Sequence, residues 1–370
     1  MYNYKDSTAR ASLPHGGGKE IKMKKNIAIV GYGGQGAWHA TWAQKSDVVS
    51  LAGVYDIAEK RMQAAKDNGI KTYSSLDEII ADKSVDIVLC ATPNDVHRDI
   101  VVAALNAKKH VICEKPVALT VEEFDDMVRA AEENGVLLSV HQNRRWDVDF
   151  LAIKSLIESG EIGEVINIES RIHGSRGIPS DWRCHKPEGG GMVLDWGVHL
   201  IDQMLKLIPE KIKRVYCEIT NITTDEVDDG FNLHLIFESG KRATIEVGTY
   251  NFIAMPRFYM QCKDGTALIE DWQKKCRVAK LKAWCEKDVL PVQTAAGITK
   301  TMAPRDEITL DHYEIDRPTS DVHDFYRNFV GAINGECEQL IKNDEVRRVL
   351  LVMLSAFESW ERGTALNVDI

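Results

Sequence analysis

Residues Asn26–His39 read NIAIVGYGGQGAWH, and this stretch decides the fold of the first part of the chain. Ile27–Val30 form an apolar run that is typical of a short buried strand, and a helical pattern begins after Gly36. The glycines at 31, 33 and 36 match the G-x-G-x-x-G turn at which a strand passes into a helix and a dinucleotide binds. Gly31 permits the tight turn, Gly33 lets the backbone approach the diphosphate, and Gly36 lets helix and strand pack closely. The stretch therefore predicts a diphosphate site on the N–H groups at the start of the helix.

A carboxylate follows at the spacing that such a site requires. A predicted strand at 48–55 ends in Asp56, twenty positions past Gly36, where an acidic side chain accepts hydrogen bonds from the adenosine ribose. The carboxylate would repel a 2′-phosphate and no arginine follows it directly, so NAD is favoured over NADP. Asp56 could also cap the helix that begins near Ala58, and both roles can hold. Cofactor contacts are expected from Gly31, Tyr32, Gly33, Gly34, Gln35, Gly36 and Asp56.

The composition narrows the function classes. A chain of 370 residues with 44% hydrophobic and 28% charged residues is expected to form two globular domains. The net charge of −10 argues against a nucleic-acid partner, and no apolar run approaches membrane-spanning length. The eight cysteines form no CxxC pair, which is typical of reduced thiols in a cytoplasmic protein. Cys184 and His185 are neighbours, but two residues are too few for a metal site, and no metal is expected.

Residues 1–25 differ from the rest of the chain and form a separate arm or a translated leader. Lys19-Glu20 can be encoded as a ribosome-binding sequence just upstream of Met23, so Met23 is the expected natural start. The alternative is a genuine N-terminal arm.

Residues 26–145 alternate strand and helix as in a doubly wound parallel sheet, a Rossmann domain. Further strands are expected at 85–92, 110–113 and 137–141, and helices at 58–69, 76–83, up to 108 and at 120–135, the last with a Thr120–Glu123 capping box. Ligands of such sheets bind at the carboxyl ends of the strands. Three polar clusters fall there: Thr92-Pro93-Asn94, Glu114-Lys115-Pro116 and Gln142-Asn143-Arg144-Arg145.

Residues 146–370 follow a different pattern and form the second domain. Apolar residues alternate with polar ones in several strands, as at Phe231, Leu233, Leu235 and Phe237, which predicts a largely antiparallel sheet with one covered face. Apolar stripes over 322–333 and 346–357 predict two closing helices, the last of which can pack back on the first domain. The expected fold class is α/β, with a Rossmann domain followed by an α/β domain that has an open, mainly antiparallel sheet.

The second domain also carries the residues suited to acid–base chemistry. After Gly189-Gly190-Gly191, apolar residues at 194, 198, 201, 205 and 208 predict a helix on which Asp195 and His199 share another face. A carboxylate one turn from an imidazole can orient it to take a proton, although both could be ordinary surface residues. Asp202, one turn on, is expected at solvent or at an interface. Lys115 can steady a developing alkoxide, and its bond to Pro116 is a candidate for the cis form.

These motifs together resemble those of the Gfo/Idh/MocA oxidoreductases, over nearly everything from Asn26 onward. The resemblance rests on GYGGQG at 31–36, ATPNDVH at 91–97, EKP at 114–116 and GGGMVLDWGVH at 189–199. It implies that Lys115, Asp195 and His199 are the catalytic trio. It also implies that Thr92, Pro93, Asn94, His97, Glu114 and Lys115 line the nicotinamide, and that Lys115, Asn143, Arg144, Arg145, Trp182, Arg183, Asp195 and His199 contact the substrate.

The resemblance implies an NAD-dependent dehydrogenase that acts on a secondary alcohol of a sugar, an inositol or a glycoside, and a homo-oligomer formed through the second sheet. Two alternatives stay open because fold does not fix function. One is a glycosidase that oxidises its sugar transiently on bound NAD, and the other is a non-catalytic sensor of NAD or sugar.

Overall fold

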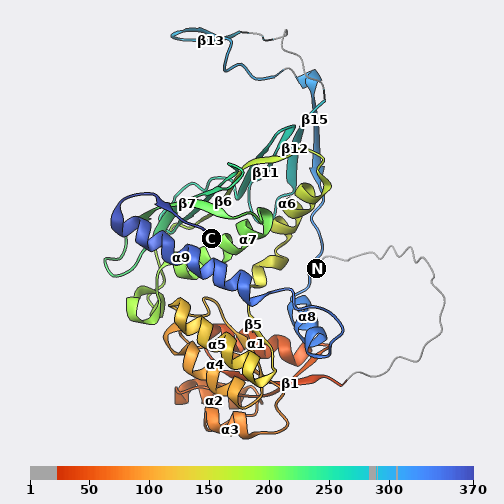
Figure 1. Ribbon diagram of the computed structural model, residues 1–370, viewed down its shortest axis with the longest axis vertical. Coiled ribbons are helices and arrows are strands. Elements are labelled where there is room, and N and C mark those ends of the chain that lie inside the picture. The colour runs from red at the N-terminus through yellow and green to blue at the C-terminus, as the bar shows by residue number, and fades with distance from the viewer. Residues whose placement is uncertain (1–22, 283–288, 290, 306) are drawn as a thin grey trace, which may run out of the picture.

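The computed structural model describes residues 23–282, 289, 291–305 and 307–370. The prediction of an arm or leader before Met23 lies outside these residues. In Figure 1 a smaller parallel sheet with its helices lies below a large sheet, and the last long helix crosses between them.

The first sheet confirms the doubly wound α/β prediction. Its strands are all parallel in the order β2-β1-β3-β4-β5, and β3 and β4 are buried along nearly their whole length. Such continuous burial is expected of a parallel sheet that is covered on both faces. The strands are β1 (Lys25–Val30), β2 (Val49–Tyr55), β3 (Ile87–Cys90), β4 (His110–Cys113) and β5 (Leu138–Val140), and the helices are α1 (Gly34–Lys45), α2 (Glu59–Asp67), α3 (Leu76–Ala81), α4 (His97–Asn106) and α5 (Val121–Asn134). The predicted capping box of Thr120 and Glu123 starts α5.

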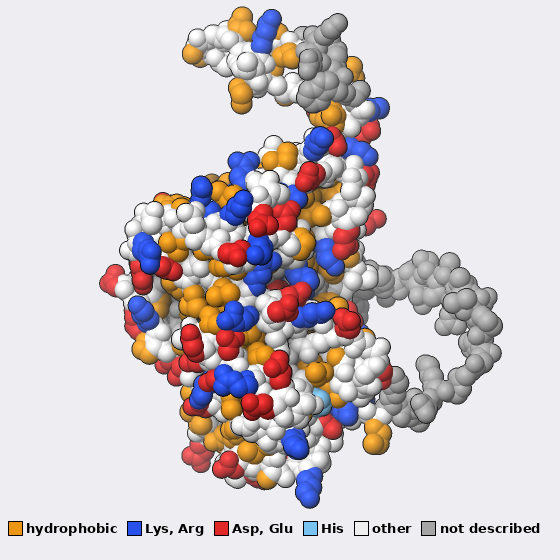
Figure 2. All heavy atoms as spheres, in the orientation of Figure 1, with side chains coloured by type: hydrophobic (Ala, Val, Ile, Leu, Met, Phe, Trp, Pro, Cys, Tyr) orange, Lys and Arg blue, Asp and Glu red, His pale blue; other side chains and the backbone are white. Residues whose placement is uncertain are grey.

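The second sheet has nine strands in the order β15-β12-β11-β10-β6-β9-β8-β7-β16. Only β6 and β9 pair in parallel, so the sheet is mainly antiparallel, as predicted. Its strands are β6 (Val165–His173), β7 (Ile212–Thr220), β8 (Gly230–Phe237), β9 (Arg242–Gly248), β10 (Phe258–Cys262), β11 (Gly265–Ile269), β12 (Cys276–Leu281), β15 (Leu310–Ile315) and β16 (Leu366–Asn367). The sequence analysis did not identify β12 and β15. Between them the short hairpin β13 (Val292–Thr294) and β14 (Gly297–Thr299) stands clear of the body (Figures 1 and 2).

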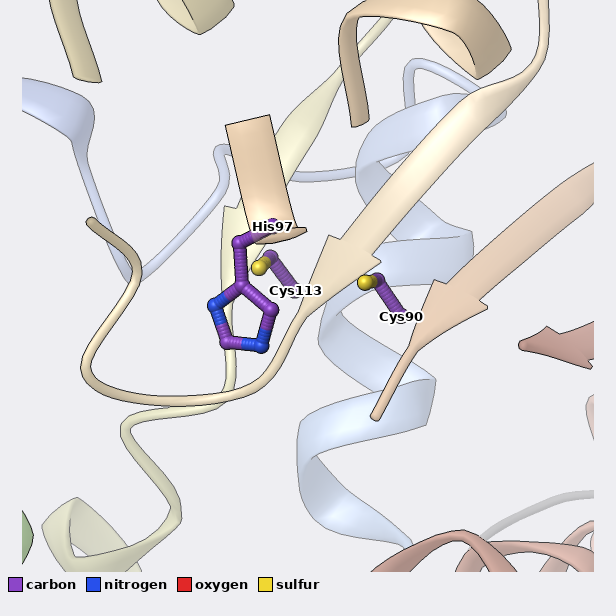
Figure 3. A group of neighbouring side chains, drawn as sticks. All are labelled: Cys90, His97 and Cys113. Atoms are coloured by element: carbon purple, nitrogen blue, oxygen red, sulfur yellow. The ribbon is translucent and has the colours of Figure 1, made fainter. Parts of the chain in front are cut away.

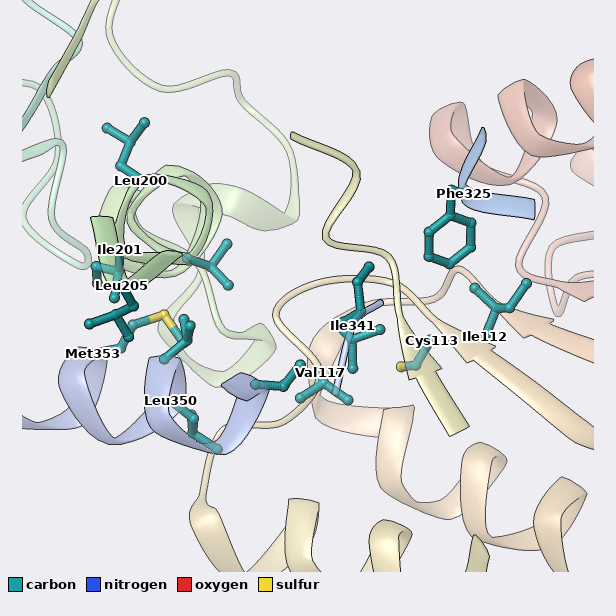
Figure 4. Close-up of a cluster of buried hydrophobic side chains, with 14 of the residues drawn as sticks. Ile112, Cys113, Val117, Leu200, Ile201, Leu205, Phe325, Ile341, Leu350 and Met353 are labelled. Carbon is teal, nitrogen blue, oxygen red and sulfur yellow. The ribbon is translucent and has the colours of Figure 1, made fainter. Parts of the chain in front are cut away.

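Helices of the second half join the two sheets. α6 (Val148–Ser159) and α7 (Val198–Leu207) precede β6 and β7, and α8 (Asp324–Ile333) and α9 (Asn343–Arg362) follow β15. Leu350 and Met353 of α9 face Ile201 and Leu205 of α7 (Figure 4). On the cofactor-domain side, Arg347 of α9 donates two hydrogen bonds to Asp125 of α5, at 2.8 and 3.0 Å. No helix among the described residues is both long and apolar enough to cross a bilayer.

The helix predicted over 194–208 begins differently. Val193–Gly197 form a π-helical turn, and the α-helix α7 starts only at Val198. The buried carboxylate of Asp228 accepts the Val193 N–H at 2.7 Å, and a Cβ at Gly191 would lie 2.1 Å from that carboxylate. Burial raises the pKa of Asp228 to about 7 despite this hydrogen bond. The start of the turn is therefore fixed by a residue far away in sequence.

We predict that Gly36→Ala destabilises the protein. A Cβ at position 36 would lie 1.8 Å from the carbonyl oxygen of Gly31, whereas one at Gly34 meets no heavy atom within 4 Å. Overpacking of this kind costs about 1–3 kcal/mol, so Gly36→Ala should unfold at a lower temperature than wild type, and Gly34→Ala should not. Thermal unfolding followed by circular dichroism measures both variants. Equal melting temperatures for the two variants would contradict the role assigned to Gly36.

Candidate active site

The glycine turn is shaped to receive a diphosphate. Gly31 has φ 93°, and the turn brings it against Ala91 and Thr92 at the end of β3. α1 begins at Gly34 with no side-chain cap and no acidic residue in its first turn. Gly34 and Gln35 are exposed at that end. The unpaired N–H groups at the start of a helix, and a first turn without an acidic residue, fit a dinucleotide diphosphate.

Asp56 lies at the end of β2, beside the glycine turn. Its Oδ2 accepts the backbone N–H of Tyr32 at 2.7 Å, and its Oδ1 accepts that of Ala58 at 2.8 Å. The Ala58 bond shapes the turn before α2, while the Tyr32 bond ties the carboxylate to the glycine turn. An ionised carboxylate offers about four acceptor positions, so it can still accept a ribose hydroxyl.

Arg61 is a residue that the sequence analysis missed. It does not follow Asp56 directly, but the first turn of α2 brings its Nη1 to 3.2 Å from Asp56 Oδ2. Its guanidinium also lies within ordinary contact distance of a Cβ placed on Gly33, and its side chain is 53% exposed. An exposed guanidinium here offsets part of the repulsion between Asp56 and a 2′-phosphate.

His97 connects the two loops that follow β3 and β4. Its Nε2 lies 3.0 Å from the carbonyl oxygen of Thr92, and its Nδ1 lies 3.1 Å from that of Pro116. The Lys115–Pro116 bond is cis, which was the candidate conformation. Asn94 Nδ2 donates to the carbonyl oxygen of Gly189 at 3.0 Å, across to the second domain. The predicted cofactor residues of this edge therefore also hold its loops in place.

Glu114 is buried in a chain of hydrogen bonds behind the strand end. Its Oε1 lies 2.7 Å from His39 Nε2 and 2.8 Å from His141 Nδ1. Burial alone would raise the pKa of Glu114, but the interactions with His141 and His39 lower it well below its usual value. Burial lowers the pKa of His39, so its neutral ring donates a hydrogen bond from Nε2–H to Glu114 and accepts one at Nδ1 from the Tyr326 hydroxyl. A buried anion thus lies directly before Lys115.

Lys115 reaches from the cofactor domain into the second domain. Its Nζ donates to the Asp195 carboxylate Oδ1 at 2.9 Å and to the Asp195 carbonyl oxygen at 2.8 Å. Asp195 Oδ2 lies 3.2 Å from Arg183 Nε. Burial would raise the pKa of Asp195, but Lys115 and Arg183 lower it below its usual value. Asp195 is therefore held between two cations.

His199 lies on α7, just beyond the π-helical turn. It is buried, and its Nδ1 has no hydrogen-bond partner among the described residues. Burial, followed by the charges of Lys115 and Arg144, holds its pKa well below the ordinary value. The imidazole is therefore neutral at physiological pH and can accept a proton. Both Asp195 oxygens face cations, so the expected direct orientation of His199 by that carboxylate is not observed.

The two neighbouring arginines have different surroundings. Arg144 stacks on the Trp196 ring at 4.2 Å and pairs with Asp147 at 3.0 Å. Arg145 is buried and binds Asp202 through Nε at 2.8 Å and Nη2 at 2.6 Å. The Arg145 guanidinium also donates to Glu345 at 2.6 Å and to the Leu340 carbonyl oxygen at 3.0 Å. Arg145 is thus occupied by internal partners. A solvent or interface position was expected for Asp202, and the solvent alternative is wrong, because Asp202 is buried where it binds Arg145 of the first domain.

The remaining predicted substrate residues lie on loops. Trp182 and Arg183 belong to a 3₁₀ turn, where the Arg183 guanidinium lies 4.6 Å from the Trp182 ring centre. Arg183 Nη1 also pairs with Asp181 at 2.9 Å. Asn143 lines a cavity of about 190 Å³ together with Trp38, His141 and Phe325.

Two buried clusters contain residue types that bind metals. Cys90, His97 and Cys113 form the first cluster (Figure 3). Both ring nitrogens of His97 lie at hydrogen-bond distance from backbone carbonyl oxygens, those of Pro116 and Thr92. In His39, Glu114 and His141, the ligand atoms are 2.7 and 2.8 Å apart, which are direct hydrogen-bond lengths. Hydrogen-bonding distances to other protein groups therefore account for the His97 nitrogens in the first cluster and for the arrangement of His39, Glu114 and His141 in the second.

Comparisons with known proteins agree with this geometry. Residues 25–142 match the model described as "Oxidoreductase family, NAD-binding Rossmann fold", and residues 150–268 match "GFO/IDH/MocA C-terminal domain". A solved NAD-binding protein from Listeria innocua shares 43% identity and a TM-score of 0.90, covering 93% of this chain and 99% of that one. An uncharacterized oxidoreductase of Schizosaccharomyces pombe is 39% identical over 196 residues, 52% of this chain and 53% of its own, so the chain spans about half the length of that curated relative.

One similar protein has a name that states its activity. The scyllo-inositol 2-dehydrogenase (NADP(+)) of Bacillus subtilis is 32% identical over 248 residues, 65% of this chain and 67% of its own. Because the two family models match residues 25–142 and 150–268 in order, the chain belongs to the Gfo/Idh/MocA family of NAD-binding oxidoreductases.

Proposed function

We propose that the protein is an NAD-dependent dehydrogenase that transfers a hydride between a secondary alcohol of a sugar, an inositol or a glycoside and a nicotinamide cofactor. One observation carries the proposal. Lys115 at the end of β4 is ion-paired with Asp195 beside His199, an imidazole that is neutral and has an unpartnered nitrogen. These groups supply a cation for the reacting oxygen and a base for its proton.

The roles follow from the charges. Bound NAD would accept the hydride from the alcohol carbon. His199 takes the hydroxyl proton, because its neutral form is favoured by burial. Lys115 stabilises the negative charge that develops on the oxygen, and Asp195 fixes the position of the Lys115 ammonium through the 2.9 Å contact. Asp56 accepts hydrogen bonds from the adenosine ribose.

The arrangement of charges favours a neutral substrate. Arg144 pairs with Asp147, and Arg183 pairs with Asp181 and Asp195. Arginines can bind a carboxylate in bidentate fashion, which would suit a uronic acid. Because each of these guanidiniums already has a carboxylate partner, a neutral polyhydroxylated ring is the better candidate. The Bacillus subtilis relative, named as an inositol dehydrogenase, supports the same class.

The proposal includes a homo-oligomer formed through the open face of the nine-stranded sheet. That face carries Arg171, which is buried between Glu169 and Glu246. A charge network of this kind suits a self-complementary contact between two copies. Native mass spectrometry should give a multiple of the monomer mass, and Arg171→Glu should shift it to the monomer. A monomeric wild type would contradict this part of the proposal.

We predict that His199→Asn lowers turnover by at least about a hundredfold, the usual low end for removal of a general base. Asparagine keeps a polar side chain but cannot take the proton. Purified protein is screened with NAD against polyols, free sugars and glycosides, and steady-state rates are measured with the best substrate. Lys115→Met should also strongly lower turnover. If Lys115 and His199 serve the same proton transfer, the double variant should lose less activity than the sum of the two single losses, expressed as free energies. NADH binding, followed by fluorescence, should stay nearly unchanged in His199→Asn.

The pH profile of the same oxidation identifies the base. A base with a lowered pKa stays neutral until the pH falls below that value, so the wild-type rate should decline only below the ordinary imidazole pKa of 6.5. His199→Asn should lack this acid limb. A variant that keeps a near-normal rate and the same limb would make His199 a structural residue.

We predict that the protein binds NAD more tightly than NADP, and that Arg61 reduces the difference between the two affinities. Arg61→Gln removes the countercharge beside Asp56, so it should weaken NADPH binding more than NADH binding. Asp56→Ser removes the repulsion and should narrow the difference. Fluorescence titration with both reduced cofactors measures the affinities, and Lys60→Gln makes the same charge change one residue away as a control. Equal or tighter binding of NADPH by wild type would refute the role given to Asp56.

A further inference from the structure

Two tryptophans and an arginine form a continuous stack beside the proposed base. The Trp196 ring lies edge-on to the His199 imidazole, with 6.0 Å between ring centres. The guanidinium of Arg144 lies 4.2 Å from the Trp196 ring centre and 5.3 Å from that of Trp272. The two indoles are 6.1 Å apart. We call Trp196, Arg144 and Trp272 the tryptophan–arginine wall, and Trp272 is two ring contacts away from His199.

The outer member of the wall is held from within the protein. Trp272 lies in the turn between β11 and β12, and the guanidinium of Arg257 is 4.9 Å from its ring centre. Arg257 is buried and anchored by Asp149 at 2.9 Å and by the side-chain oxygen of Gln203 at 3.0 Å. Arg317 donates to the Trp272 carbonyl oxygen at 3.1 Å. The ring is therefore positioned before any ligand arrives, which lowers the entropic cost of binding.

Two features of the wall are unexplained by packing alone. Trp272 is 39% exposed although it lies next to buried charged groups. The Nε atom of Arg144 is buried and has no hydrogen-bond partner within the described part of the chain. A single exposed aromatic residue is common on protein surfaces. An exposed indole that stacks on a guanidinium with an unpartnered nitrogen, two ring contacts from the proposed base, instead points to a ligand.

We propose that the tryptophan–arginine wall binds a second ring attached to the sugar that is oxidised, so that the substrate is a ring-bearing glycoside and not a free monosaccharide or inositol. This inference rests on the proposed function. The negative face of an indole attracts the C–H face of a sugar ring and also stacks with an aromatic aglycone. The guanidinium of Arg144 adds a planar cation that can stack or donate hydrogen bonds. The sugar to be oxidised then lies at His199 and Lys115, and its substituent lies against Trp272.

The test compares ligands that differ only in the second ring. Methyl and phenyl glucopyranosides, cellobiose and maltose are titrated into the protein with NADH bound, in both anomeric forms of the glucosides, and binding is measured by saturation-transfer NMR and calorimetry. Wild type should bind at least one ring-bearing ligand roughly 3- to 10-fold more tightly than the methyl glucoside, as expected for one stacked ring. Trp272→Ala should reduce this ratio of affinities to about one and leave the affinity for methyl glucoside within about twofold of the wild-type value. Trp272→Phe should retain most of the ratio, because a ring remains.

The control is Trp360→Ala, which removes a comparably exposed tryptophan, 44% exposed, from α9. It should leave the ratio unchanged. If Trp272→Ala weakens the binding of the disaccharides alone, the second ring is a sugar. If it weakens the binding of the phenyl glucoside alone, the second ring is an aromatic aglycone. A ratio near one in wild type, or one unchanged in Trp272→Ala, overturns the inference. A changed native mass in Trp272→Ala with an unchanged ratio also overturns it, because Trp272 would then belong to an interface.

The same measurements separate this inference from the proposed function, because binding does not require turnover. A Trp272-dependent preference without any NAD-linked oxidation would keep the ring-binding subsite and remove the dehydrogenase. Oxidation of free sugars or inositols with no Trp272-dependent preference would keep the dehydrogenase and remove the subsite.

Discussion

The ion pair between Lys115 and Asp195 is the contact on which the arrangement of the site depends. Lys115 ends a strand of the cofactor domain, and Asp195 sits in the π-helical turn of the second domain. Both side chains are mostly withdrawn from water, so the two charges stabilise each other. Loss of Asp195 would leave the Lys115 ammonium without its carboxylate partner, and loss of Lys115 would leave Asp195 paired with Arg183 alone. The pair therefore sets the distance from the end of β4 to His199.

Other buried charges fix the groups around this pair. Glu114, which immediately precedes Lys115 in sequence, is held by two histidines, and His97 holds the loops on either side. On the opposite side, Asp228 determines where the π-helical turn begins. Few groups are proposed for chemistry, and the segments that carry Lys115 and Asp195 are fixed by neighbours outside the proposed proton transfer. Such support is what places catalytic groups accurately enough to act.

Much of the fold and part of the candidate site could be predicted from the sequence, because the sequence patterns that indicate them are local. The glycine turn, the buried strands and the Thr120–Glu123 capping box depend on residues within a few positions of one another, and the structure has each of them. The polar clusters at the strand ends were found by one topological rule, which brings Thr92 and Lys115 to the same edge. The π-helical turn could not be predicted, because its first N–H is bound by Asp228.

Most of the site residues that were missed or misplaced depend on contacts distant in sequence, and Arg61, five positions after Asp56, is the exception. Arg145 stands in a polar cluster at a strand end, but its partners Asp202 and Glu345 lie 57 and 200 positions away. Arg61 returns to Asp56 only through the geometry of α2, and nothing in the local sequence marks Trp272 as a neighbour of Trp196. No local motif could have distinguished these cases.

Helix α9 has a consequence for how the molecule unfolds. Its buried side chains Leu350 and Met353 pack on α7, its Arg347 binds α5, and its Glu345 closes the network around Arg145. Neither domain can lose its structure while α9 keeps all of its partners. The stabilities of the first and second domains are therefore thermodynamically coupled, and a substitution in the interior of either one weakens the cooperative unit that contains both.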